Sequence, residues 1–310
     1  MPVTENAIPW TELDPAGVPR GSLGFVWGNC QAESIRRMIA PVALEHGVRF
    51  LRLPPVFEMS AADVARLHAL LPNAGVLVTQ PVKDEYRIPG CGSRQLIEKL
   101  ADSARVVTVP STHYEGLHPW QVHAHDEAGG SVDAPLVDYH DLRLLTAADR
   151  GWDVARAAEF VAASDPDPAA VQELAAASLA ELRRRTADLD VDTTDAVVAA
   201  GASAMWTVNH PSNAVLGALG RDVLSALGWS GEPEVPEYEM LGRIRTPVAR
   251  AVREALRLPI AAAQSWQIDD EPVAWEIVAE PALELYRQRP DLVGRTLDRY
   301  RDRVAALERR

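Results

Sequence analysis

Short apolar runs alternate with helix-like segments over the first third of the chain. The apolar runs predict strands at 24–27, 48–53, 75–79 and 105–109. Between them, apolar residues return every three or four positions, which is the spacing of one face of an α-helix. This β–α repetition is typical of a doubly wound α/β fold, in which a parallel sheet is covered by helices on both faces.

Local signals set the ends of the predicted helices. The helix after Cys30 has one apolar face, formed by Ile35, Met38, Ile39 and Val42. Pro41 should kink or end that helix, because proline lacks an amide N–H and its ring clashes with the preceding turn. Ser60 and Ser93 are predicted to cap the next two helices with their hydroxyl groups.

The regular pattern ends at Pro110. Residues 111–135 contain four histidines and form a long predicted loop, which is a usual place for a ligand site. Helical patterns return over 136–190. Met205–Val208 then predicts a fifth strand that leads into a further helix.

These patterns divide the chain into three segments. Residues 1–22 are rich in proline and should form an extended N-terminal arm. Residues 23–230 should form the α/β core, with a helical insertion at about 136–200. Residues 231–310 begin with a proline- and glutamate-rich connection and should form a helical C-terminal extension. The predicted fold class is therefore an α/β doubly wound parallel sheet with helical insertions and a helical C-terminal extension.

Composition narrows the class of protein. With 47% hydrophobic residues, the 310-residue chain can bury a sizeable core, yet no run is long enough to cross a membrane. The two cysteines favour a reducing compartment, and the N-terminus lacks the apolar segment of a signal peptide, so we expect a cytoplasmic protein. The net charge of −13 disfavours non-specific binding to nucleic acid. An anionic ligand would therefore need a local basic cluster.

A cysteine stands where the first strand should turn into the first helix. Gly28-Asn29-Cys30-Gln31 predicts a tight turn with the cysteine at the helix N-terminus. Free backbone N–H groups and the positive end of the helix dipole meet there, and both favour a thiolate. We therefore predict a lowered pKa for Cys30 and faster alkylation near neutral pH than for Cys91. The alternative is a small buried cysteine after a strand-end turn.

Polar residues follow three of the predicted strands. Cys30 follows the first, Gln80 the third and His210 the fifth. Because ligands of open α/β sheets bind beyond the carboxyl ends of the strands, we expect these side chains to share a site. Cys30 would be a nucleophile, His210 the base for its proton, and Gln80 with the Cys30 N–H would bind an oxyanion. The structural alternatives are a helix-capping histidine and a strand-end amide that satisfies the backbone.

These residues resemble blocks of the SGNH hydrolase family. Gly28-Asn29-Cys30 stands in the place of that family's Gly-Asp-Ser elbow, and His210-Pro211 resembles its last block with the catalytic histidine. Gln80 lies near the place of the family's oxyanion-hole asparagine. The chain departs from the family pattern at Cys30, which replaces the serine, and at Thr207, which stands where the family has an acid three residues before the histidine.

A closer resemblance is to the WcbI-type polysaccharide biosynthesis family. It covers about residues 22–230 and rests on motifs that occur in order along the chain: Gly28–Gln31, Gln80 with Tyr86-Arg87, Pro110 with Tyr114-Glu115-Gly116 and His118-Pro119, Tyr139-His140, and Asn209–Pro211. The resemblance implies an SGNH-like sheet, a coenzyme A site and acyl transfer. The implied reaction is acetylation of a sugar or related hydroxyl with acetyl-CoA as co-substrate, so the expected partner is a small molecule or a saccharide.

The resemblance also implies roles for single residues. Cys30 and a histidine would be catalytic: His210 is the first candidate for the base, and His140, flanked by Asp138 and Asp141, is the second. The residues expected to bind an oxyanion or substrate are Asn29, Gln31, Gln80, Tyr114 and His118. The residues expected to bind coenzyme A are Gly28 and Arg87.

Other outcomes stay open at this point. We expect no metal, because the loop with His118, His123 and His125 lacks a convincing fourth ligand. Cys91 is expected to be an incidental thiol. The alternative functions are hydrolysis of an ester or thioester by the same residues, and ligand binding or scaffolding without turnover, which the missing acid at Thr207 favours. The sequence does not specify an oligomeric state.

Overall fold

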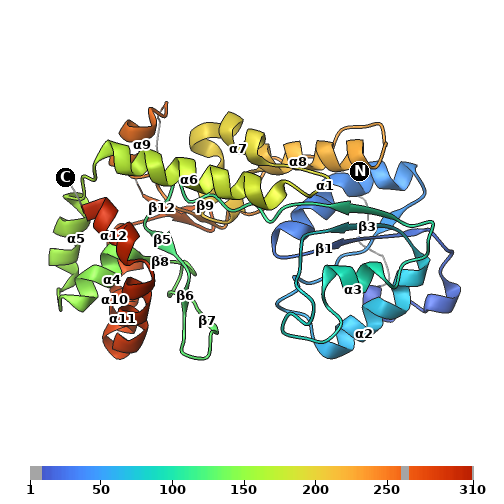
Figure 1. Cartoon of the computed structure of the whole chain (residues 1–310), viewed down its shortest axis with the longest axis horizontal. Coiled ribbons are helices and arrows are strands. Elements are labelled where there is room, and N and C mark those ends of the chain that lie inside the picture. Colours follow the sequence, from blue (N-terminus) through green and yellow to red (C-terminus); the bar gives the residue numbers. More distant parts are fainter. Residues whose placement is uncertain (1–8, 260–264, 309–310) are drawn as a thin grey trace. The chain divides into compact units, whose positions relative to one another are not determined.

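The computed structural model describes residues 9–259 and 265–308 and divides into two compact units (Figure 1). The residues of unit 1 fall within 1–112, 183–199 and 213–241, and those of unit 2 within 113–182, 200–212 and 242–310. Segments 136–200 and 231–310, expected to form an insertion and an extension, each contribute residues to both units.

Unit 1 is built on a four-stranded parallel sheet. Its strands are β1 (Leu23–Trp27), β2 (Arg49–Phe50), β3 (Ala74–Thr79) and β4 (Arg105–Thr108), in the order β2-β1-β3-β4. All neighbouring strands pair in parallel, and Val78 of β3 lies opposite Val26 of β1 and Val107 of β4. The predicted α/β class and parallel sheet are confirmed, although β2 is shorter than the predicted run.

Helices cover both faces of this sheet (Figure 1). One face carries α1 (Gln31–Glu45) and α8 (Asn213–Ala226), and the other carries α2 (Ala61–Leu70) and α3 (Ser93–Ile97). Alternate strand residues point to opposite faces. Val26 therefore packs with side chains of α1 and α8, whereas Phe25 packs with side chains of α2 and α3. This packing holds the carboxyl ends of β1 and β3, and the turns that follow them, on a rigid support.

The caps of α2 and α3 differ from each other. Ser60 caps α2 as predicted: its hydroxyl accepts a hydrogen bond from Asp63 N, and Asp63 Oδ2 accepts one from Ser60 N at 2.9 Å. Ser93 is not a cap but the first residue of α3, and Gly92 is the cap. The Ser93 hydroxyl instead donates to the backbone oxygen of Gln80 at 2.6 Å, which ties α3 to the end of β3.

Pro41 does not end α1, which continues to Glu45. The expected end of the helix at this proline is wrong because Ile39 and Val42, on either side of Pro41, are buried in the core. Tertiary burial of an apolar helix face outweighs the single backbone hydrogen bond that the proline removes.

The N-terminal segment is not an extended arm over the residues described. It contains 3-10 turns at Trp10–Glu12 and Pro15–Gly17. Trp10 and Leu13 are buried in the same apolar cluster as Phe25. The proline content of this segment predicts irregular backbone, but it does not reveal these two apolar anchors.

Unit 2 has a helical core. Its helices include α4 (Leu142–Asp149), α5 (Val154–Ala162), α9 (Arg250–Leu256), α10 (Trp275–Gln288), α11 (Pro290–Arg299) and α12 (Arg301–Glu308), while α6 (Pro168–Thr186) and α7 (Thr194–Ala200) contribute to both units. Leu145, Leu283 and Tyr286 belong to the buried cluster that joins several of these helices. Of the helices that the structure describes, none has both the length and the apolarity to cross a bilayer.

Short antiparallel ladders complete unit 2. They pair β5 (Gln121–Val122) with β8 (His140–Asp141), β6 (Ala124–His125) with β7 (Ser131–Val132), β9 (Met205–Thr207) with β10 (His210–Pro211), and β12 (Trp266–Ile268) with both β11 (Ile244–Arg245) and β13 (Glu271–Val273). The segment 205–208 is therefore not a fifth strand of the parallel sheet, because β9 pairs with β10. The ladder of β11 to β13 was also not predicted, since runs of two or three residues are too short for periodicity to reveal them.

Candidate active site

The turn between β1 and α1 holds Cys30 at the start of the helix, as predicted. Cys30 is the N-cap residue of α1 and is half-buried. Asn29 shapes the turn, because its Oδ1 accepts a hydrogen bond from Gln31 N at 2.9 Å and its backbone oxygen accepts one from Ala32 N at 3.0 Å. The Asn29 amide also donates to Ser111 Oγ at 2.8 Å, which ties the turn to the loop after β4.

Two buried glutamines strengthen this connection. Gln80 Oε1 accepts from Asn29 N at 2.8 Å, and Gln80 Nε2 donates to Pro110 O at 3.2 Å. Gln31 makes a double hydrogen bond with Thr112: Oε1 accepts from the backbone N–H at 2.9 Å, and Nε2 donates to the backbone oxygen at 2.8 Å. The structure therefore brings Asn29 and both glutamines to one turn.

Gly28 is required by the close approach of Gln80. A Cβ at this position would lie 2.2 Å from Gln80 Oε1, well inside van der Waals contact. The second hydrogen of Gln80 Nε2 points to Gln31 Oε1 at 3.5 Å. Because both ends of its amide are engaged, Gln80 positions the turn in this structure, and its role at an oxyanion stays a prediction.

The predicted lowering of the Cys30 pKa is wrong. Burial raises the pKa of the Cys30 thiol from 9.0 to about 11. The backbone N–H groups of Cys30 and Gln31 lower this pKa but do not offset burial, and Glu58 adds a small increase. Cys30 is therefore almost entirely a neutral thiol at pH 7.

Alkylation tests the state of this thiol. In a Cys91→Ser variant Cys30 is the only cysteine, and serine can replace Cys91 Sγ as the donor to Tyr86 O. We expect iodoacetamide to modify Cys30 slowly at pH 7 and roughly tenfold faster for each further pH unit up to about pH 10, because only the thiolate reacts. A rate that is already constant between pH 7 and 9 would contradict the raised pKa.

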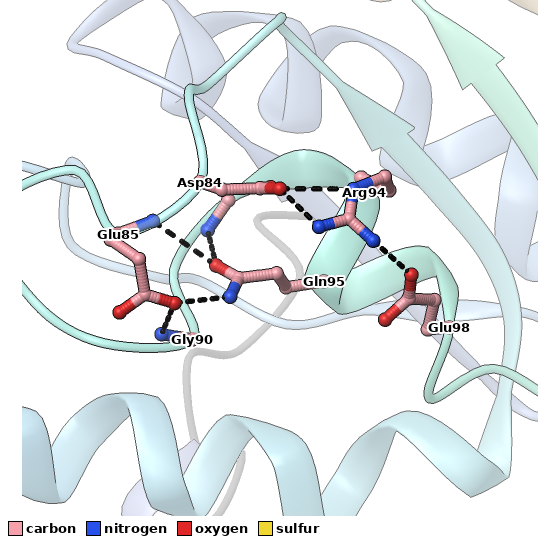
Figure 2. A network of polar contacts seen from close by, with 7 residues as sticks. Asp84, Glu85, Gly90, Arg94, Gln95 and Glu98 are labelled. Atoms are coloured by element: carbon pink, nitrogen blue, oxygen red, sulfur yellow. Dashed lines mark hydrogen bonds and ion pairs between the residues drawn. The ribbon is translucent and has the colours of Figure 1, made fainter.

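The loop after β3 is braced by α3 (Figure 2). Arg94 forms ion pairs with Asp84 and Glu98, and its Nε lies 2.9 Å from Asp84 Oδ2. Gln95 Oε1 accepts hydrogen bonds from two backbone N–H groups of the loop, Glu85 N at 3.2 Å and Gly92 N at 3.0 Å. These contacts give the loop a defined shape although most of its side chains are exposed.

Arg87 extends from this braced loop into solvent. Its backbone φ of 60° lies in the left-handed region, and its side chain is exposed. Within the part of the chain that the structure describes, its guanidinium has no ion-pair partner. The loop follows β3 and the Cys30 turn follows β1, so both lie at the carboxyl edge of the same parallel sheet.

In unit 2, a cluster of hydroxyl and amide groups adjoins His210. The Tyr139 hydroxyl donates to Asn209 Oδ1 at 2.6 Å and accepts from Thr207 Oγ1 at 3.0 Å. The same Tyr139 oxygen lies 3.4 Å from the His210 ring nitrogens. Thr207, at the position where the SGNH family has an acid, is therefore connected to His210 through the Tyr139 hydroxyl.

His210 is held in its neutral form. Burial lowers the pKa of His210 from 6.5 to about 4, with smaller contributions from the positive charges of Arg243 and His123. A neutral imidazole at pH 7 has a nitrogen that can accept a proton. The structure thus keeps His210 in the protonation state that a general base requires.

His140, the second predicted base, is a buried histidine with both ring nitrogens engaged. Nδ1 lies 2.9 Å from Tyr286 Oη, and Nε2 lies 2.7 Å from Val132 O. The neighbouring carboxylates do not orient the ring, because Asp138 and Asp141 each pair with an arginine. The expected carboxylate orienter is therefore absent among the residues described, and the contacts of His140 favour a structural role.

Tyr114 and His118 are also buried in unit 2. Tyr114 N donates to Val208 O at 2.8 Å, and His118 Nε2 lies 3.2 Å from Met205 O. Burial lowers the pKa of His118 from 6.5 to about 4, so the ring is neutral at pH 7. These contacts fasten the segment 114–118 to β9 and its turn.

Glu115 is a polar residue whose role the sequence did not reveal. Its carboxylate pairs with Arg303 and lies 3.3 Å from His113 Nε2. Burial raises the pKa of Glu115, but His113 and Arg303 outweigh burial and bring it down to about 2. His113 therefore has a carboxylate partner of the kind that orients catalytic histidines. The Tyr114-Glu115-Gly116 motif marked Glu115 as a residue of interest, but no local sequence pattern indicated that Arg303 would be its ion-pair partner.

The predicted site residues thus form two groups. Unit 1 holds Gly28, Asn29, Cys30, Gln31, Gln80 and Arg87, and unit 2 holds Tyr114, His118, His140 and His210. The joint action of Cys30 and His210, which belong to different units, stays a prediction. In residues 9–259 and 265–308, no group of three His, Cys, Asp or Glu side chains is arranged to hold a metal ion.

Comparison with protein families identifies the chain. The model of the family described as polysaccharide biosynthesis enzyme WcbI matches residues 23–232. The chain belongs to the WcbI family. The match covers the Cys30 turn, the loop after β3 and the segments that carry Tyr139 and His210. As a member of the WcbI family, the chain is an enzyme of polysaccharide biosynthesis.

A solved structure shares the fold of this WcbI family member. The similarity has a TM-score of 0.77 at 19% sequence identity and covers 93% of this chain and 98% of the other. That structure is described as WcbI, a polysaccharide biosynthesis enzyme, in its native form without a disulfide bond between coenzyme A and one of its cysteines. No curated protein matches the chain significantly.

Proposed function

We propose that this WcbI family member is an acyltransferase that moves an acetyl group from acetyl-CoA to a sugar hydroxyl. The observation that carries the proposal is the Cys30 turn, which holds a half-buried thiol at the start of α1. The solved WcbI is described as native protein without a disulfide bond between coenzyme A and one of its own cysteines. By analogy, we assign the sulfur end of coenzyme A to the neighbourhood of Cys30.

The reaction makes one bond and breaks another. The sugar hydroxyl oxygen attacks the acetyl carbonyl carbon, the C–S bond to coenzyme A breaks, and the hydroxyl proton passes to a base. With its raised pKa, Cys30 is better suited at pH 7 to donate a hydrogen bond to the departing thiolate than to act as a nucleophile. His210 would be the base, in keeping with its neutral state.

The phosphate groups of coenzyme A require a local cation, because the chain carries a net charge of −13. Arg87 meets this requirement, since its guanidinium is exposed and has no ion-pair partner among the residues described. A guanidinium and a phosphate form strong, bidentate, charge-assisted hydrogen bonds. The contacts of Arg94 and Gln95 in Figure 2 already order the loop, so binding would cost less conformational entropy.

Calorimetry with coenzyme A tests the donor site. We expect the wild type to bind and Arg87→Ala to bind roughly ten- to a hundredfold more weakly, because a charge-assisted contact is worth about 1.5–3 kcal/mol. Arg221→Ala removes another exposed arginine of unit 1, on α8, and should bind like the wild type. Absence of measurable binding by the wild type would overturn the acyl-CoA proposal. Equal binding by Arg87→Ala would remove only the role given to Arg87.

A further inference from the structure

A cavity of about 390 Å³ lies within unit 2. Its walls come from segment 117–121, the start of α4, the end of α5, segment 246–253, and the side chains of Trp266 and Trp275. This volume falls in the range of small-molecule binding sites. The proposed acyl transfer uses none of its wall except His118, whose role as a substrate contact came from the sequence.

The cavity wall combines aromatic rings with polar groups. Trp120, Trp266 and Trp275 all line it. The guanidinium of Arg143 lies 4.1 Å from the centre of the Trp120 ring and covers one face of that ring. Tryptophan offers a large apolar surface next to hydrogen-bonding groups. A pyranose ring has the matching character, with an apolar C–H face and a rim of hydroxyl groups.

Two buried polar atoms in this wall have no hydrogen-bond partner among the residues described. They are Gln121 Oε1 and Arg253 Nε. Gln121 is only 4% exposed, and its other amide atom, Nε2, donates to Thr246 Oγ1 at 2.6 Å. Arg253 Nη1 donates to Val248 O at 2.9 Å. Neither atom can be reached by a water molecule in this structure, so a ligand hydroxyl can satisfy this acceptor and this donor only after the two side chains rotate toward the cavity.

The charges of the wall disfavour a cationic ligand. Arg143 is neutralised by Asp141, with 2.6 Å between their nearest charged atoms. Burial lowers the pKa of His118 to about 4, so that ring adds no charge at pH 7. Arg253 adds a positive charge without an ion-pair partner in the described part of the chain. A neutral or anionic ligand fits this balance.

We propose that this cavity is a saccharide-binding subsite that takes one hexopyranose unit, neutral or carrying a carboxylate. The tryptophans would pack against the C–H face of the ring. On binding, the Gln121 and Arg253 side chains would rotate toward the ring, so that Gln121 Oε1 accepts a hydrogen bond from a sugar hydroxyl and Arg253 Nε donates one. The inference rests on the proposed function, which needs a sugar acceptor, but the bound unit need not be the one that is acetylated.

Saturation-transfer NMR tests the subsite with three probes: methyl α-D-glucopyranoside, methyl α-D-mannopyranoside and methyl β-D-glucuronide. We expect the wild type to bind at least one probe, and Gln121→Leu and Arg253→Lys to bind it at least about tenfold more weakly, as expected for loss of one good hydrogen bond. Arg253→Lys keeps the positive charge and removes the Nε donor. Gln288→Leu and Arg287→Lys make the matched changes at exposed positions of α10 and should bind like the wild type.

The outcomes separate the subsite from the proposed function. Binding of the methyl glycosides supports a neutral unit, and stronger binding of the glucuronide supports an acidic one. No binding of any probe by the wild type, or equal binding by both cavity variants, overturns the subsite. Thermal unfolding shows whether each variant is folded. If Gln121→Leu does not fold, the sugar affinity of Arg253→Lys alone tests the subsite. Coenzyme A calorimetry on the same samples is independent: sugar binding without coenzyme A binding would overturn only the acyl-CoA proposal.

Discussion

Replacing His210 by alanine should lower the rate of acetyl transfer by about 10²–10⁴-fold, which is the usual loss when a general base is removed. His210 is neutral at pH 7, and the Tyr139 hydroxyl lies 3.4 Å from its ring. The measurement is kcat with acetyl-CoA at a saturating acceptor concentration. Turnover close to the wild-type rate would show that another group takes the proton.

His140→Ala is the matched control. Its loss leaves Tyr286 Oη and Val132 O without their partner, at a cost of about 1–3 kcal/mol for each buried group left unsatisfied. We therefore expect a lower melting temperature, with an unchanged kcat for the folded fraction. A fall in kcat with unchanged stability would instead restore His140 as the base.

The pH profile of the wild type gives a second check on His210. Because burial lowers its pKa to about 4, the base form is kept from neutral pH down to that value and is lost below it. Activity limited by His210 should therefore persist below pH 6 and decline near pH 4. A decline centred near pH 6.5 would indicate a histidine of ordinary pKa.

Gly28→Ala should destabilise unit 1 by about 1–3 kcal/mol, the typical cost of overpacking. The new Cβ would lie 2.2 Å from Gln80 Oε1. To avoid this clash, the Gln80 side chain must move and lose its hydrogen bond from Asn29 N. Since this turn holds Cys30, coenzyme A binding should weaken as well. Urea unfolding and calorimetry measure the two effects.

A second substitution isolates the cause of this loss. In a Gln80→Ala background the space beside residue 28 is open, so Gly28→Ala should cost much less than it does in the wild type. The two changes should therefore show a coupling of about 1 kcal/mol or more, as contacting residues do. Gly294→Ala, whose Cβ would meet nothing within 4 Å, should cause no loss. Equal costs of Gly28→Ala in both backgrounds would contradict the steric explanation.

The sheet and the Cys30 turn could be predicted from sequence because local patterns determine them. The apolar run that becomes β3 is buried over most of its length, and the Ser60–Asp63 box starts α2 where the capping signal stands. The turn before α1 needs Gly28 for the approach of Gln80 and Asn29 for its hydrogen bond to Gln31 N. The capping box and the Asn29 turn can be recognised within a few residues, whereas the need for Gly28 comes from Gln80, at the end of another strand.

The remaining features depend on parts of the chain that are distant in sequence. The helix N-terminus favours a Cys30 thiolate, but the burial that reverses the expected pKa shift comes from the assembled fold. Glu115 and Arg303 are 188 residues apart, so no local pattern reveals their pairing. His140 stands between two acids in the sequence, yet its ring meets Tyr286, 146 residues away. Local pattern thus indicated the parallel sheet of unit 1 and the candidate residues but not the protonation states or partners of those residues.

The most direct test of acyl transfer follows acetyl-CoA with and without a sugar acceptor. The wild type is incubated with acetyl-CoA and each of the three probe glycosides, free coenzyme A thiol is measured over time, and the sugars are analysed by mass spectrometry. We expect thiol release to depend on an acceptor and the acceptor to gain one acetyl group. Release at the same rate without any acceptor, or no consumption of acetyl-CoA at all, would contradict the proposed acyltransferase.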